Sequence, residues 1–155
     1  MISPAPMSIS RRFAVRWSDA DANGHVRHTV YPELSVEVRL AWLAEGGWDW
    51  KRFERERIGP VLLREEIDYR REVGLNGSVV IDLEAAGLSP DGGRWKIRHT
   101  VRKDDGEVAA VVLVLGGWMD LEARRLVVAP PSLLELLLAA PRASDFAELP
   151  PLRRA

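Results

Sequence analysis

The feature that most constrains the fold is one long apolar helix segment that precedes a series of strand segments. The helix is predicted from Val30 to Glu45, because Thr29 can cap its start and Gly46-Gly47 supplies a stop. Apolar residues cover much of its circumference: Val30, Leu34, Val36, Val38, Leu40, Ala41, Trp42 and Leu43. Such a helix should be mostly buried.

Strand signals lie on both sides of this helix. The first strand is predicted from Ile9 to about Trp17, where apolar and polar residues alternate. Further strands are predicted at 61–69, 78–88, 94–103, 108–119 and, in a short form, 126–129. Turn signals separate them at Asn76-Gly77, Asp91-Gly92-Gly93 and Asp105-Gly106. We therefore predict an α+β fold, in which an antiparallel sheet of about five to six strands wraps around one long buried helix.

The C-terminal part contains a last helix and a tail. Pro130-Pro131 precedes Ser132, which forms a capping-box pattern with Glu135 and predicts a helix through about Ala140. Residues 141–155 are rich in Pro and Arg, and they are expected to be a surface or disordered tail. The chain is thus interpreted as one domain of residues 1–140 followed by the tail.

Composition limits the possible partners and compartments. A formal net charge of −1 and a pI near 6.3 give no positive field for nucleic acid, so nucleic acid is not an expected partner. The chain has no cysteine, which excludes thiol nucleophiles, disulfides and Cys-ligated metals. No segment has the length of a membrane span or the pattern of a secretory leader, so we expect a cytoplasmic protein without a membrane partner.

The most informative segment carries the loop before the helix. Residues 15–43, VRWSDADANGHVRHTVYPELSVEVRLAWL, resemble the 4-hydroxybenzoyl-CoA thioesterase-like branch of the hotdog superfamily. That branch has an aromatic residue, a D-x-D-x-x-G segment, a short turn, and then the hotdog helix with a tyrosine at its start. The matching positions here are Trp17, Asp19, Asp21, Gly24 and Tyr31. A looser similarity covers most of the remaining chain, and the resemblance implies a hotdog fold and acyl-CoA thioesterase activity.

The resemblance also implies roles for residues of this loop. The second aspartate of the D-x-D pair, Asp21, is the carboxylate that attacks the thioester or activates water. A backbone N–H at or next to His28 polarises the thioester carbonyl, as suits the positive end of a helix. This chain has Arg27 and His28 where many relatives have consecutive asparagines. Contacts with the substrate are implied for Gly24, His25 and Tyr31.

Structural roles explain several of the other polar residues. An aspartate three residues before a glycine, as Asp21 is, usually belongs to a turn or cap, but the surrounding strand, loop and helix favour the catalytic role for Asp21. Asp19 is expected to be structural, as an acceptor for amides of the loop. His25 would orient the loop by hydrogen bonding. A metal site formed by these aspartates with His25, His28 and the distant His99 is disfavoured, because His-x-x-His in a loop lacks the geometry of known sites. No serine elbow, phosphate loop or dinucleotide pattern occurs, so no cofactor is expected.

One predicted strand carries a row of basic residues at alternating positions: Arg94, Lys96, Arg98 and Arg102. Such a row is usually a solvated face, but Arg94 and Arg98 are also candidates for holding the phosphates of coenzyme A. Trp42, Trp48 and Trp50 either pack or line an acyl pocket.

We therefore predict an acyl-CoA thioesterase that releases free acid and CoA, with Asp21 as nucleophile or general base. Two alternatives remain: a hotdog protein that binds acyl-CoA or a partner without catalysis, and a thioesterase acting on acyl carrier protein. A single domain would leave a sheet edge unpaired, so a homodimer or homotetramer is expected.

Overall fold

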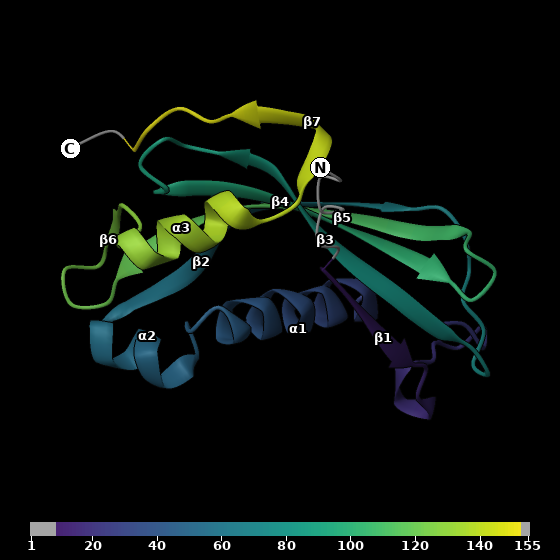
Figure 1. Ribbon diagram of the computed structural model, residues 1–155. Helices are drawn as coiled ribbons and strands as arrows, with labels where there is room; N and C mark the ends of the chain where they lie inside the picture. Colours follow the sequence, from purple (N-terminus) through teal and green to yellow (C-terminus); the bar gives the residue numbers. More distant parts are fainter. Residues whose placement is uncertain (1–8, 153–155) are drawn as a thin grey trace, which may run out of the picture.

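The computed structural model describes residues 9–152 and shows a curved sheet wrapped around one long helix (Figure 1). The helix is α1, and its bounds Val30–Glu45 are those predicted. The seven strands are β1 Ile9–Ala14, β2 Ile58–Tyr69, β3 Ser78–Leu88, β4 Arg94–Lys103, β5 Val108–Asp120, β6 Arg125–Val127 and β7 Arg142–Glu148. The remaining helical elements are η1 Trp17–Asp19, α2 Trp50–Glu56 and α3 Pro131–Ala139. The predicted α+β hotdog fold is confirmed.

The order of the strands in the sheet is β1-β3-β4-β5-β2, with β6 pairing β5 and β7 pairing β3. All of these pairs are antiparallel except that of β3 with β7. Within residues 9–152, β2 pairs with β5 alone, so no described strand covers the other edge of its 12 residues. This edge exposes Leu62 and Leu63. Exposed apolar residues on an unpaired edge favour association with another strand.

The core lies between α1 and the concave face of the sheet. Val38 and Trp42 of α1 are buried, as expected for the central helix. Leu34 is only partly buried, and Leu40 is exposed, so the helix is not covered around its whole circumference. From β4, Trp95 enters the core, and the alternate residues of that strand face the outer side of the sheet.

The chain after Pro141 differs from the predicted tail. Residues 142–148 form β7, which pairs in parallel with the C-terminal part of β3, after the part of β3 that pairs with β1 (Figure 1). The alternative of a disordered tail is therefore wrong for this segment, whereas most of its residues are exposed at the surface, as expected. The Pro/Arg-rich composition gives no strand pattern, because β7 is stabilised by contacts with distant segments. It pairs with β3, and Asp145 accepts two hydrogen bonds from the guanidinium of Arg98, both with N–O distances of 2.7 Å. Residues 153–155 of the predicted tail lie outside the described residues.

Three local predictions are also corrected. The capping box at Ser132 is wrong, because α3 begins after Pro130 and no side chain caps it. Thr29 occupies the cap position of α1, but its side chain makes no cap hydrogen bond. Trp17 was predicted on the buried face of the first strand, but it lies in η1 with 86% of its surface exposed.

No helix within residues 9–152 has the length and apolar composition needed to cross a bilayer.

Candidate active site

Asp21 lies in the loop between η1 and α1, where its carboxylate shapes a tight turn. Its Oδ1 accepts hydrogen bonds from the backbone N–H groups of Asn23 at 2.8 Å and His25 at 3.2 Å. The N–H of His25 is the main cause that lowers the pKa of Asp21, so the side chain is a carboxylate at neutral pH. Its Oδ2 accepts no hydrogen bond from residues 9–152 and is available to a substrate or water.

Asp19 is the other aspartate of the motif, and it is 2% exposed. Its Oδ2 accepts from the backbone N–H of Arg16 at 2.8 Å, and its Oδ1 accepts from the Arg16 side chain at 2.9 Å. Burial raises the pKa of Asp19, but the hydrogen bonds and charge of Arg16 outweigh it, and the net shift is downward. Because both oxygens are occupied, these contacts support the structural role assigned to Asp19.

The start of α1 presents backbone donors beside Asp21. Across residues 9–152, no acceptor is found for the N–H groups of His28, Thr29 and Tyr31. Unsatisfied N–H groups at a helix start carry partial positive charge, which suits an oxygen that becomes negative during a reaction. The carbonyl of His28 is occupied differently, because it accepts a hydrogen bond from the Tyr69 hydroxyl at 3.3 Å. His28 is thus held beside Tyr69 while its N–H remains free.

Asp21 and the helix start line one cavity of about 360 Å³. The predicted residues in its wall are Asp21, His25, His28 and Tyr31. Tyr31 is buried, and its ring lies 5.8 Å from that of Tyr69 at the end of β2. Gly24 is not part of the wall, but its φ of 77° is a conformation that glycine adopts without strain, so it shapes the Asp21 turn.

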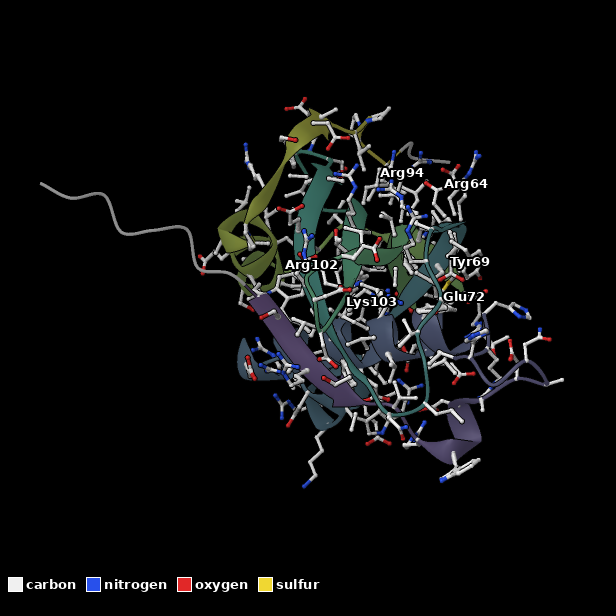
Figure 2. All side chains as sticks on the ribbon, turned by 90° about the vertical axis from the view of Figure 1, so that its right-hand side faces the viewer. Arg64, Tyr69, Glu72, Arg94, Arg102 and Lys103 are labelled. Atoms are coloured by element: carbon white, nitrogen blue, oxygen red, sulfur yellow. The ribbon has the colours of Figure 1, made fainter. Side chains whose placement is uncertain are left out.

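Four residues at and after the end of β2 complete the cavity: Tyr69, Arg70, Arg71 and Glu72. Sequence reasoning did not select them, although they lie in the segment IDYRREVG that carries the looser resemblance. Glu72 contacts His25, with 3.2 Å between Oε2 and Nε2, and so joins this segment to the Asp21 loop. Figure 2 labels Tyr69 and Glu72 close together, at the right of the view.

His99, the most distant residue of the disfavoured metal set, lies elsewhere. It is fully buried on β4, where its ring faces Arg39 of α1. Among residues 9–152, no group of three or more His, Asp or Glu side chains is placed to hold a metal ion.

The basic row of β4 faces the outer side of the sheet and does not line the Asp21 cavity. Arg98 donates to both carboxylate oxygens of Asp145 on β7. Arg94 pairs with Gly117 of β5, whereas Tyr69 pairs with Ala110 of that strand, so Arg94 lies at the other end of the sheet from Tyr69. A second groove, of about 440 Å³, is lined by Arg70, Arg98 and Arg102 among others. Arg70 lines both cavities, so Arg98 is connected with the Asp21 site through this residue, whereas Arg94 is not.

A long helix wrapped by a mostly antiparallel sheet is the hotdog fold, and in this chain a carboxylate and free N–H groups lie together at the start of that helix. The model of the thioesterase-like superfamily matches residues 15–137, and the chain belongs to this family.

Among curated proteins, the chain is similar to the chloroplastic acyl-[acyl-carrier-protein] hydrolase FATB1 of Cuphea viscosissima, with 29% identity over 99 residues. The match covers 64% of this chain, which spans only 20% of that relative's length.

Solved structures share the fold. The hypothetical protein SAV2348 from Staphylococcus aureus, in complex with CoA, has a TM-score of 0.83 and 18% identity, with 100% of this chain and 94% of that chain covered. Slr0204, a 1,4-dihydroxy-2-naphthoyl-CoA thioesterase from Synechocystis, has a TM-score of 0.76 and 13% identity, with coverages of 85% and 96%.

Proposed function

We propose that this protein hydrolyses acyl-CoA thioesters at the Asp21 cavity. The observation that carries the proposal is the juxtaposition of one free carboxylate oxygen with the unsatisfied N–H groups at the start of α1. A nucleophile or base beside an oxyanion site is the minimum machinery for acyl transfer to water. A CoA complex of a protein with the same fold is in keeping with a CoA substrate.

In this proposal the thioester carbonyl oxygen points at the N–H groups near His28. Oδ2 of Asp21 either attacks the carbonyl carbon, forming an anhydride that water then cleaves, or removes a proton from the water that attacks. In both routes the C–S bond breaks and the thiolate of CoA takes up a proton. The Asx turn around Oδ1 holds the carboxylate in place, so that it loses little entropy when it reacts.

Arg70 is the residue best placed to receive the phosphates of CoA. It lines both the Asp21 cavity and the outer groove that also contains Arg98 and Arg102. Guanidinium groups bind phosphate by paired hydrogen bonds. The role proposed for Arg98 is weaker than the sequence suggested, because Asp145 already neutralises it, and Arg94 lies apart.

The decisive variant is Asp21→Asn, which keeps the shape and hydrogen bonding of the turn but cannot act as base or nucleophile. Hydrolysis of the best substrate in an acyl-CoA panel, measured by release of free thiol, should fall at least ~100-fold. Asp105→Asn is the matched control, because Asp105 forms the same turn contact, to the N–H of Glu107 at 2.9 Å, in the exposed hairpin between β4 and β5. Wild-type turnover by Asp21→Asn would refute the proposed mechanism.

The same panel decides between the alternatives. Acyl carrier protein thioesters are included because the FATB1 relative is an acyl-[acyl-carrier-protein] hydrolase. Turnover of these alone would transfer the proposal to that substrate class. CoA binding without turnover of any thioester would favour a binding protein. We also propose that the protein acts in the cytoplasm, where CoA thioesters are available, as a homodimer or homotetramer.

A further inference from the structure

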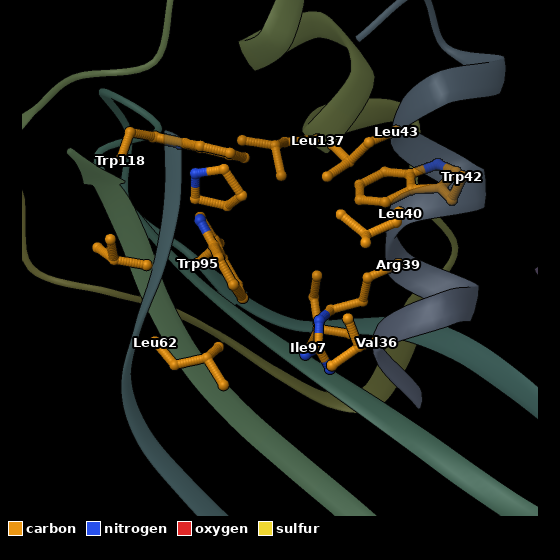
Figure 3. A pocket seen from close by; sticks show the side chains of 12 residues that line it. Val36, Arg39, Leu40, Trp42, Leu43, Leu62, Trp95, Ile97, Trp118 and Leu137 are labelled. Atoms are coloured by element: carbon orange, nitrogen blue, oxygen red, sulfur yellow. The ribbon is translucent and has the colours of Figure 1, made fainter. Parts of the chain in front are cut away.

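An apolar cavity of about 180 Å³, which we call the second cavity, lies between the C-terminal half of α1, α3 and the sheet. It is distinct from the Asp21 cavity and from the outer groove lined by Arg70, Arg98 and Arg102. Its wall is apolar and aromatic, with Trp42, Trp95 and Trp118 among its residues, and Arg39 is the one charged residue that lines it. Figure 3 shows Arg39 reaching from α1 toward Ile97 of β4. Of the tryptophans suggested for an acyl pocket, only Trp42 lies here, because Trp48 packs on Phe53 and Trp50 is exposed.

Arg39 is 7% exposed, and its charge has no acidic partner. Within residues 9–152, no carboxylate lies within 4.0 Å of its guanidinium; the nearest acidic influence is that of Glu65 on β2. A buried cation in apolar surroundings is costly unless an anion or hydrogen-bond acceptors compensate it. The cavity therefore contains a positive charge that the protein itself does not neutralise.

His99 holds the guanidinium in place. Its Nδ1 lies 2.8 Å from the carbonyl oxygen of Asp82, which can only accept, so Nδ1 carries the proton. Nε2 is then an acceptor, and it receives a hydrogen bond from Nη1 of Arg39 at 3.1 Å. A guanidinium has five N–H donors, and this bond uses only one of them. Arg39 is thus oriented by one contact and retains donors for a ligand.

Both cavities contact α1, one at its start and one at its C-terminal half. Tyr31, Ser35 and Arg39 are spaced by four residues and lie on the same side of the helix. Tyr31 lines the Asp21 cavity, and Val36 lines the second one. At 1.5 Å per residue, these two residues are only about 7.5 Å apart along the helix axis. An acyl group bound at Asp21 would have to extend about 12 Å along the helix axis, the separation of Tyr31 and Arg39, to meet this guanidinium.

We propose that the apolar cavity receives the distal part of the acyl group, and that Arg39 makes the site selective for acyl chains that end in a carboxylate. The inference rests on the proposed function in one respect, namely that the acyl group of the substrate is what enters the cavity. The aromatic walls would pack against the methylene chain or ring, and the fork of Arg39 would pair with the terminal carboxylate.

The test compares pairs of CoA thioesters with the same number of carbons, from four to twelve, whose acyl chains end in either a carboxylate or a methyl group. At the best length, wild-type kcat/KM should favour the ω-carboxyacyl-CoA at least tenfold. Arg39→Met should lower that preference at least tenfold, and Arg39→Lys should lower it less, because an ammonium lacks the planar fork. No wild-type preference at any length, or a preference that both variants retain, would overturn the inference.

Calorimetry separates this inference from the proposed function. If no thioester is hydrolysed, the proposed function fails, and binding of the same pairs to the wild-type protein decides about Arg39. Tighter binding of the ω-carboxyacyl member, lost in Arg39→Met, would support the site. Equal affinities would overturn it. Should Arg39→Met not fold, the wild-type comparison and Arg39→Lys give the same decision.

Discussion

The buried pair of His99 and Arg39 predicts a specific dependence of stability on pH. Burial, followed by the charge of Arg39, lowers the pKa of His99 from 6.5 to about 3. The carbonyl of Asp82 opposes this shift by accepting from Nδ1, and Glu65 is the acidic residue that acts on Arg39. Arg39 keeps its charge at neutral pH, since burial lowers its pKa only to about 10.

The sign of the effect follows from where protons bind. In the unfolded chain His99 takes up a proton below about pH 6.5, whereas in the folded protein it stays neutral until about pH 3. The unfolded state therefore binds more protons in this window, and the free energy of unfolding falls as the pH falls. Below the unfolded-state pKa of about 6.5, the free energy of unfolding falls by about 1.4 kcal/mol per pH unit, so that it should be about 2 kcal/mol lower at pH 5 than at pH 8. Most carboxylates remain ionised over this range, since their unperturbed pKa is about 4.

Urea unfolding at pH 8, 7, 6 and 5, at one protein concentration, measures this slope. His99→Gln keeps a polar side chain near Arg39 but cannot be protonated, so its curve should be flatter by about 2 kcal/mol over the same range. His28→Gln, at an exposed position, is the matched control and should retain the wild-type slope. Parallel curves for the wild type and His99→Gln would refute the argument that a neutral buried histidine supports Arg39.

Two further predictions concern packing and assembly. Gly116→Ala should destabilise the protein by about 1 to 3 kcal/mol, because an added Cβ would lie 2.2 Å from the ring of the buried Trp95. Gly74→Ala is the control and should be neutral or slightly stabilising, because an added Cβ there would have no atom within 4 Å. Equal urea midpoints for the two variants would contradict this packing. Light scattering at micromolar concentration should give a mass of at least twice the 17.4 kDa of one chain. The reason is that the open edge of β2 exposes Leu62 and Leu63, and Leu40 is exposed near Leu62. The mass of a monomer would contradict this prediction.

Local signals were sufficient for the elements whose ends carry turn residues. α1, β3 and β4 have the predicted bounds, because Gly46-Gly47 and the Asn-Gly and Asp-Gly turns leave little freedom at those positions. β2 begins at Ile58, before the predicted start at Val61, because the strand includes Gly59 and Pro60, which are residues typical of turns. Proline is tolerated there because β2 is an edge strand, where a residue can lack a backbone donor on its open side.

The elements that were missed depend on contacts between distant segments. β7 lacks an alternating pattern of its own, and it is defined by its pairing with β3 and by the Arg98–Asp145 fork, 47 residues apart. The candidate site shows the same division. Asp21 and the helix start lie in one continuous motif, whereas Tyr69 and Glu72 lie at and after the far end of β2 and reach the site only through the fold. A single arginine inside an apolar helix gives no signal of its own, since a charged residue there is usually solvated.

In the proposed mechanism, the orientation of α1 about its own axis connects catalysis with the choice of substrate. Successive helix residues are rotated by about 100°, so Val38 cannot take the place of Arg39 without a change in the start of the helix. Val38 is buried and does not line the second cavity, whereas Arg39 lines it together with the exposed Leu40. The same start of the helix fixes which N–H groups are free beside Asp21. A change that shifted the helix by one residue would therefore displace the proposed oxyanion donors and the Arg39 side chain together, so that in the proposed mechanism one helix sets both the reaction centre and the preference for a terminal carboxylate.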